Sequence, residues 1–387
     1  MSLSAHDLIP DELFDRILGR AAHHDQTNTF PHDDWSELSA AGYLRMMVPK
    51  ELGGLGCSLE VAVEAQARLA QAAPATALAV NMHLIWTAVA TVLRSQGDNS
   101  LEFVLRDAAA GEFFAFGVSE PGNDLVLFDS LTEAVTSADG SVAFTGTKIF
   151  TSGSPVWTRL GVFGLDRAGA EPTLVHGFVS RDDPGVSSLD DWDTIGMRGS
   201  QSHTTVLRAA VAPADRVHGR RPVGPSGHPL VFAIFACFEL LVSAVYVGIA
   251  ERSAHLAIAA VRHKRSRRTG MRGDQNPDTR WKIADITLAL DALWPPLRAL
   301  AADVDRGVDH GDQWFRYLTG VKLRSTAGAR DIVGRAVAVA GGAAFFSSHE
   351  LGRLYRDVLA GGFHPSNDDS VHHTVASAVL GPLGEPS

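Results

Sequence analysis

The chain has 387 residues, of which 45% are hydrophobic and 20% are charged, and this composition excludes wholesale disorder. Its 34 Lys and Arg against 44 Asp and Glu leave a net charge of −10, which excludes a general binder of nucleic acid or of anionic membranes. Two cysteines, Cys57 and Cys237, exclude a disulfide framework and a zinc site built on cysteine pairs, and no metal site is expected.

Residues 1–110 have the pattern of a helical domain. Apolar side chains recur at intervals of three and four near Leu8 and again near Val61. Pro31 and Pro74 are each followed by residues typical of the first turn of a helix. The N-terminus has neither the basic run nor the apolar run of a signal peptide, so a cytoplasmic protein is expected.

Residues 111–222 have the pattern of an antiparallel β domain. Short β-branched or aromatic runs alternate with Gly, Asp and Pro, as expected for strands joined by turns. These runs occupy 113–118, 134–135, 142–144, 160–165, 174–179 and 204–211. Between the second and third runs, Asp139-Gly140 predicts the tight turn of a hairpin.

Residues 223–387 return to a helical pattern and predict a bundle. The stretch 230–250 is long and apolar enough to span a bilayer, but Glu239 lies at its centre, where a carboxylate disfavours membrane insertion. We therefore expect a buried core helix and no membrane span. Gly and Pro predict helix breaks near 270–277, 307–311, 341–342 and 361–365.

The order of helices, strands and helices predicts an α+β fold with three domains, 1–110, 111–222 and 223–387. The chain has neither a GxGxxG turn opening a βαβ unit nor a GxxxxGK[ST] loop. A Rossmann or P-loop enzyme is therefore not expected.

Four stretches have residue types suited to chemistry, although each is also consistent with ordinary structure. Residues 116–122 (FGVSEPG) end a strand at a turn with exposed amides, and 146–154 (GTKIFTSGS) place Phe150 and Ser152 two apart, on one side of an extended strand. Residues 196–200 (GMRGS) hold an arginine between glycines. The run 262–272 is basic, which suits a solvated helix end or a bound phosphate.

These stretches, in this order, resemble the motifs of the acyl-CoA dehydrogenase flavoprotein family over nearly the whole chain. The Gly341-Gly342 and Arg356-Asp357 pairs resemble two further landmarks of that family. The resemblance implies FAD as cofactor and an N-terminal helical domain, a central β domain and a C-terminal helical bundle. It implies flavin contacts for Phe116, Val118, Ser119, Phe150 and Ser152, and phosphate contacts for Lys264 and Ser266.

Three departures from the family pattern concern the substrate, the cofactor and the catalytic base. Gly122-Asn123-Asp124 stands where a Gly-Ser-Asp usually meets an acyl thioester, and Ala338 replaces a cofactor-site glutamine. In the turn where many members have their catalytic glutamate, this chain has Pro365, with Asn367 at the position of a threonine near the cofactor. The chain therefore resembles a divergent member without the usual C-terminal base.

Three residues are candidates for proton transfer. Glu239 is the only charge within 230–250 and lies next to a position where some family members have their base, although a buried ion pair would explain it equally well. His364 is next to Pro365, and in the oxygenase branch of the family a C-terminal histidine serves near the flavin. His203, between Ser202 and Thr204, is the weakest of the three.

The resemblance implies α,β-dehydrogenation of an acyl thioester, on coenzyme A or a carrier protein, with Glu239 or His364 as base and hydride transfer to flavin N5. Two alternatives stay open: a two-component flavin monooxygenase on the same fold, acting at carbon, nitrogen or sulfur, and a catalytically silent binding subunit. An electron-transfer flavoprotein or a flavin reductase is the expected redox partner. A homotetramer or homodimer is expected, in which the basic run reaches the cofactor of a neighbouring subunit.

Overall fold

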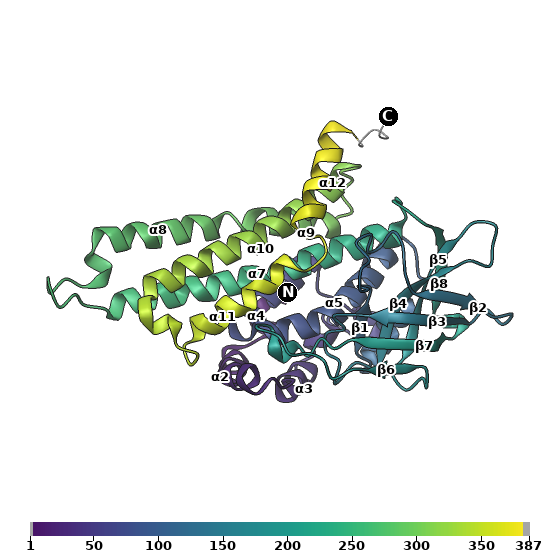
Figure 1. Cartoon of the computed structure of the whole chain (residues 1–387), viewed down its shortest axis with the longest axis horizontal. Coiled ribbons are helices and arrows are strands. Elements are labelled where there is room, and N and C mark those ends of the chain that lie inside the picture. Colours follow the sequence, from purple (N-terminus) through teal and green to yellow (C-terminus); the bar gives the residue numbers. More distant parts are fainter. Residues whose placement is uncertain (1–2, 382–387) are drawn as a thin grey trace.

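The computed structural model describes residues 3–381 (Figure 1). Its N-terminal part is helical, and the longest helix there, α5, begins at Pro74 as predicted. A proline at the first helical position fits because its missing N–H would have no partner in the helix. The helices are α1 (Ala5–Leu8), α2 (Asp11–Thr27), α3 (His32–Ala40), α4 (Leu59–Ala72), α5 (Pro74–Ser95) and α6 (Glu102–Ala109).

One eight-stranded sheet follows, in the order β6-β7-β3-β2-β4-β5-β8, with β1 beside β4. The predicted turn at Asp139-Gly140 joins β2 to β3. The strands are β1 (Phe114–Gly117), β2 (Glu133–Thr136), β3 (Val142–Lys148), β4 (Arg159–Asp166), β5 (Thr173–Ser180), β6 (Val186–Ser188), β7 (Thr205–Ala212) and β8 (Val217–Pro222).

The sheet is mixed, and not purely antiparallel as expected, because β1 and β2 both run parallel to β4. Two parallel strands need a long connection between them. The chain from β1 to β4 passes through β2 and β3, and the chain from β2 to β4 passes through β3 and the loop after it. Turn residues mark hairpins only, so the sequence has no local signal for these two pairings.

The C-terminal helices form a bundle around α7 (Pro229–His263), which runs along the long axis of the molecule as far as the sheet (Figure 1). The four predicted helix breaks all fall between α-helices, the first of them ending at Pro277, where α8 begins. The others are α8 (Pro277–Asp291), α9 (Trp294–Asp305), α10 (Gln313–Ala340), α11 (Glu350–Val358) and α12 (Asp368–Leu380). Short 3-10 helices are η1 (Tyr43–Arg45), η2 (Lys50–Leu52), η3 (Arg198–Ser200), η4 (Ala214–Arg216), η5 (Gly273–Gln275), η6 (Gly341–Phe345) and η7 (Leu359–Gly362).

Two helices, α5 and α7, are long and apolar enough to cross a membrane by length and composition. In each, about nine-tenths of the apolar window is buried inside the protein: 94% for α5 and 89% for α7. This burial confirms that 230–250 forms a core helix. The predicted helix–sheet–helix order is also confirmed.

Close packing between layers explains two glycines. A Cβ at Gly161 of β4 would overlap the ring of Trp86, whose indole Nε1–H donates to the Ala115 carbonyl of β1 (3.0 Å). A Cβ at Gly248 of α7 would overlap the Ala67 carbonyl of α4. These contacts join α5 to the sheet and α4 to α7, and so fix the position of α7 relative to β1.

Candidate functional site

The first two stretches of the sequence lie side by side, next to α7. The Ile149 N–H donates to the Ser119 carbonyl (2.9 Å), so the chain after β3 runs beside the chain after β1. The Phe116 ring stacks on Phe238 of α7, with ring centroids 5.6 Å apart. Val118 is buried and Ser119 half-buried. The end of β1 is therefore held between the 149–154 loop and α7.

Phe150 and Ser152 do not lie on an extended strand, so the prediction that they share one side of it is wrong. Strand β3 ends at Lys148, and Phe150 takes a left-handed backbone with φ of +58°. The loop turns because it hydrogen-bonds to residues 200–203: the Gly153 N–H donates to Ser200 O (3.0 Å). Ser152 is buried, and its hydroxyl accepts a hydrogen bond from Ser202 (2.8 Å).

The Phe150 ring remains 48% exposed and meets Trp192 edge to face, with centroids 6.1 Å apart. A left-handed backbone is costly for a bulky residue and persists where the surrounding structure enforces it, often at functional sites. The half-exposed aromatic pair of Phe150 and Trp192 offers an apolar surface beside the loops that carry the Ser119 and Ser152 hydroxyls. A planar flavin ring fits such a surface, because it can stack on aromatic side chains and hydrogen-bond to neighbouring hydroxyls.

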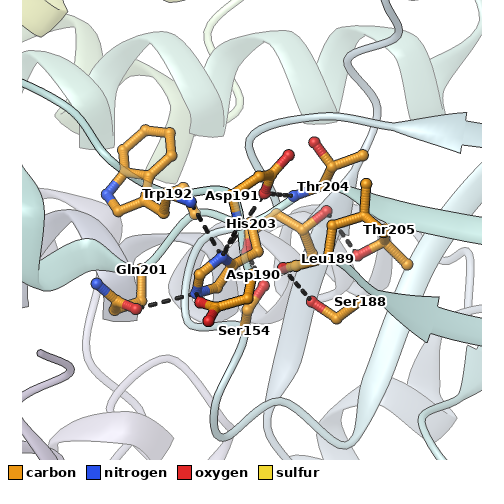
Figure 2. Close-up of polar contacts among 12 residues, drawn as sticks. Ser154, Ser188, Leu189, Asp190, Asp191, Trp192, Gln201, His203, Thr204 and Thr205 are labelled. Atoms are coloured by element: carbon orange, nitrogen blue, oxygen red, sulfur yellow. Dashed lines mark hydrogen bonds and ion pairs between the residues drawn. The ribbon is translucent and has the colours of Figure 1, made fainter.

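His203 orders the loop that carries Trp192 (Figure 2). Its Nδ1 accepts hydrogen bonds from the backbone N–H groups of Asp191 (3.1 Å) and Trp192 (3.2 Å). Because Nδ1 accepts, the ring proton lies on Nε2, which donates to Gln201 Oε1 (2.9 Å). Both ring nitrogens thus have protein partners, and this arrangement explains His203 without a part in proton transfer.

The two leading candidates for proton transfer come together in one group of residues, hereafter the turn cluster: Glu239 and Tyr246 of α7, Lys322 of α10, and His364 and Ser366 after η7. Glu239 Oε1 accepts from the Ser366 N–H (3.2 Å) and hydroxyl (3.0 Å). The Lys322 ammonium donates to the carbonyls of Gly361, His364 and Ser366, at 3.2, 3.0 and 2.6 Å. The cluster therefore anchors the 361–366 turn to two helices.

Burial sets the protonation of Glu239. Its side chain is 1% exposed, and Oε2 has no hydrogen-bond partner within residues 3–381. Desolvation raises the pKa of Glu239 to about 8, against the opposing charge of Lys322 and the hydrogen bonds from Ser366. Burial in turn lowers the pKa of Lys322.

His364 lies over Tyr246, whose hydroxyl is 2.7 Å from His364 Nε2. Burial, aided by the Lys322 charge, lowers the pKa of His364 to about 3. The imidazole is therefore neutral at physiological pH. A neutral ring can donate from one nitrogen and accept at the other.

We expect the free energy of unfolding of the wild-type protein to fall as pH rises from about 5 to 8, and we expect Glu239→Gln to abolish this pH dependence. In this window the folded protein keeps a proton on Glu239, whereas the unfolded chain, with the ordinary pKa of 4.5, has lost it. The folded state binds more protons, so its free energy of unfolding falls with rising pH. Glutamine keeps an oxygen for Ser366 but does not ionise.

Urea unfolding at several pH values checks this, with Glu171→Gln, at an exposed position, as the control. The control should keep the pH slope of the wild type, and Glu239→Gln should flatten it. If the free energy of unfolding depended equally on pH in all three proteins, the raised pKa of Glu239 would be contradicted.

Of the other predicted cofactor residues, Lys264 and Ser266 lie away from these groups, whereas Asn367 directly follows Ser366 of the turn cluster. Lys264 and Ser266 follow α7 at the end opposite the sheet (Figure 1), where the Ser266 N–H donates to Met271 O (2.9 Å). Asn367 caps α12, its Oδ1 accepting from the Ser370 N–H (3.0 Å). The structure does not bring Lys264 or Ser266 to the Phe150 region of the same chain. Their contact with a cofactor, across a subunit boundary, stays a prediction.

Sequence reasoning missed four residues that the structure makes central: Lys148, Tyr246, Lys322 and Trp192. For Lys322 there was a signal, since it lies four residues after the apolar Leu318 and seven before Ala329, on the buried face of α10. A lysine on such a face needs partners to be buried.

Known proteins resemble both helical parts of the chain. Residues 10–112 match the family described as acyl-CoA dehydrogenase, N-terminal domain, and residues 240–369 match acyl-CoA dehydrogenase, C-terminal domain. L-evernosamine nitrososynthase from Micromonospora sp. is 30% identical over 362 residues, which cover 90% of this chain and 83% of that protein. The putative acyl-CoA dehydrogenase YdbM of Bacillus subtilis is 26% identical, over 95% of this chain and 94% of that protein.

A solved structure resembles the whole fold. The X-ray structure of KijD3 in complex with FMN and dTDP-3-amino-2,3,6-trideoxy-4-keto-3-methyl-D-glucose has a TM-score of 0.86 and 27% identity, covering 99% of this chain and 95% of that one. This agreement extends over both helical parts and the sheet. The chain thus belongs to the acyl-CoA dehydrogenase flavoprotein family and is a flavin-dependent oxidoreductase.

Proposed function

We propose that this chain is a flavin-dependent monooxygenase that oxygenates the nitrogen of an amine, and that its substrate is a nucleotide-linked amino sugar. One observation carries the proposal: the 361–366 turn presents the neutral imidazole of His364 and no carboxylate. Removal of a Cα proton from a thioester requires a base, and His364 with its lowered pKa is a weak one. The similarity to a nitrososynthase and to KijD3 bound to a dTDP-amino sugar supports the same reaction.

Bound reduced flavin would supply the two electrons that activate O₂: one oxygen atom enters the amine to give a hydroxylamine, and the other leaves as water. Phe150 and Trp192 would pack against the ring, and Ser119 and Ser152 lie on the adjoining loops. We propose FMN as this flavin, in place of the FAD expected from the sequence, because the KijD3 complex contains FMN. A separate flavin reductase is then the redox partner.

His364 would donate a hydrogen bond to the oxygen that is transferred, or to the substrate beside it. The Lys322 bonds to the turn carbonyls keep that ring in place. Because His364 is neutral, it adds no positive charge that would repel a protonated amine. On the side of α7 and α10, where Glu239, Tyr246 and Lys322 are buried, the turn cluster is closed to bulk water.

The test supplies the full-length protein with FMN, NADH and a flavin reductase, and follows dTDP-amino sugars by mass spectrometry. A mass gain of one oxygen, with ¹⁸O incorporated from ¹⁸O₂, supports the proposal. Failure to oxygenate any amine, with flavin bleaching anaerobically on an acyl-CoA, would sink it. Release of the bound flavin and its chromatography decides between FMN and FAD.

A second candidate is the dehydrogenation expected from the sequence, and one observation favours it. Glu239 is a buried carboxyl group with a pKa of about 8, as a base for a Cα proton would need, and its Oε2 has no hydrogen-bond partner among the described residues. Anaerobic bleaching of the flavin by an acyl thioester, lost in Glu239→Gln, would support this reading. Bleaching that survives Glu239→Gln would remove Glu239 from it.

We also infer a homo-oligomer, the homotetramer or homodimer expected from the sequence. Four large apolar side chains support it, because a soluble monomer rarely exposes this much apolar surface: Phe345 (94% exposed) at the end of η6, Phe346 (68%) directly after it, and Trp281 (73%) and Leu288 (69%) on α8. Light scattering measures the mass directly, and a monomer would contradict the inference.

A further inference from the structure

The hydroxyl of Tyr246 is fully buried in α7, and a buried phenol needs a hydrogen-bond acceptor. The neighbour that meets this need within residues 3–381 is His364 Nε2, at 2.7 Å. Burial raises the pKa of Tyr246 well above its ordinary value, so the phenol keeps its proton. The hydroxyl is then the donor and Nε2 the acceptor.

A ring that accepts at Nε2 carries its proton on Nδ1. His364 is half-buried, and no hydrogen bond joins Nδ1 to the protein in the part of the chain that the structure describes. The Nδ1–H group is therefore the one that remains for a substrate. We propose that Tyr246 is a positioning residue, which donates its phenol hydrogen to His364 Nε2 and so selects the tautomer of the neutral imidazole that presents Nδ1–H to the substrate; this rests on the monooxygenase function proposed above.

The charged groups around Tyr246 and His364 either favour a neutral imidazole and a protonated phenol or are compensated by a neighbouring charge. Lys322 of α10 lies close enough to His364 to oppose a second positive charge. Glu239 of α7 is bound to Ser366 and offset by Lys322, which also feels Asp368 of α12. Asp357 of α11 acts on Tyr246 and further disfavours the phenolate. None of these acids is hydrogen-bonded to His364, so Tyr246 is the direct partner that sets the ring's form.

Hydrogen–deuterium exchange at the C2 carbon of histidine, read by mass spectrometry on the full-length protein, tests the inference. A peptide spanning 360–366 contains His364 as its one histidine. Followed from pH 2 to 9, its exchange in the wild type should show a midpoint of about 3, the low value that burial and the Lys322 charge give the pKa of His364. In Tyr246→Phe the midpoint should rise by about 0.5 to 1 pH unit, the equivalent of one neutral hydrogen bond. The control is Tyr355→Phe, at a half-exposed side chain, which should leave the profile unchanged.

A wild-type midpoint near the ordinary value of 6.5 would overturn the inference, whether or not Tyr246→Phe folds. An unshifted midpoint in a folded Tyr246→Phe protein would overturn it as well. Turnover adds a second measurement: the acid-side loss of kcat should begin at a higher pH in Tyr246→Phe than in the wild type, by about the same 0.5 to 1 pH unit. If exchange behaves as expected but no amine is oxygenated, the proposed function fails and the assignment of Tyr246 stands.

Discussion

Replacing His364 with alanine is expected to lower kcat for amine oxygenation about 10²- to 10⁴-fold, the usual contribution of a positioned proton-transfer or hydrogen-bonding group. The reason is its place in the turn cluster: the ring is the polar group that the 361–366 turn offers beside Tyr246. Oxidation of reduced flavin by O₂ needs no such group. The variant should therefore still consume NADH through the reductase and release hydrogen peroxide.

The measurement is the coupling, that is, the ratio of oxygenated product to NADH consumed. It separates a loss of amine oxygenation from a loss of flavin oxidation. His372→Ala, at an exposed position on α12, is the control and should keep both rates. His364→Gln restores a side-chain N–H donor and should recover part of the loss. Product formation by His364→Ala within a few-fold of the wild type would remove His364 from the reaction.

The order of the fold was predictable because its signals are local. A proline at the start of α5, Asp139-Gly140 at the hairpin, and the glycines between the C-terminal helices each act on their immediate neighbours. Periodicity of apolar residues needs only one element at a time. The parallel pairing of β1 with β4 joins segments about 45 residues apart, and no turn residue specifies it.

The candidate site was predictable only in parts, for the same reason. Glu239 was conspicuous as a lone charge in an apolar helix, and His364 as the neighbour of a missing base. Each contacts a residue far away in the sequence: Tyr246 and His364 are 118 residues apart, and Glu239 and Ser366 are 127 apart. No local sequence pattern could therefore predict these contacts. The error at Phe150 arose likewise, since hydrogen bonds to residues 200–203 override the extended backbone that the strand pattern suggests.

One residue of the second stretch has a structural task that the family resemblance did not assign. Lys148, at the end of β3, is fully buried, and its ammonium donates to Glu120 Oε1 (2.7 Å) and to Phe163 O (2.9 Å). Glu120 also accepts from Ser130 (2.7 Å) and Thr132 (2.6 Å). Burial raises the pKa of Glu120, but the Lys148 charge and these hydrogen bonds outweigh it and bring the value to about 2.

We expect Lys148→Met to lower the free energy of unfolding by about 3–5 kcal/mol at pH 7, because it leaves the Glu120 carboxylate buried without a counter-charge. Since that pair joins the strand before Phe150 to the turn after Ser119, flavin affinity should fall with it. Urea unfolding measures the first effect and flavin fluorescence the second. Arg335→Met, the control, removes exposed ion pairs with Asp331 and Asp285 and should cost about 1 kcal/mol or less.

Two further measurements, at acid pH and on a double variant, show whether the unpaired charge of Glu120 causes the loss of stability in Lys148→Met. Glu120 is ionised in the folded wild type down to about pH 2, so its contribution is present above the ordinary pKa of 4.5 and is lost as pH falls from there towards 2. The gap between Lys148→Met and wild type should therefore narrow in that window. Glu120→Gln combined with Lys148→Met should recover most of the loss, since no unpaired charge remains buried. A loss that is equally large in the double variant would mean that Lys148 acts through the contact of its ammonium with the Phe163 ring, 4.7 Å from the centroid, and not through its pairing with Glu120.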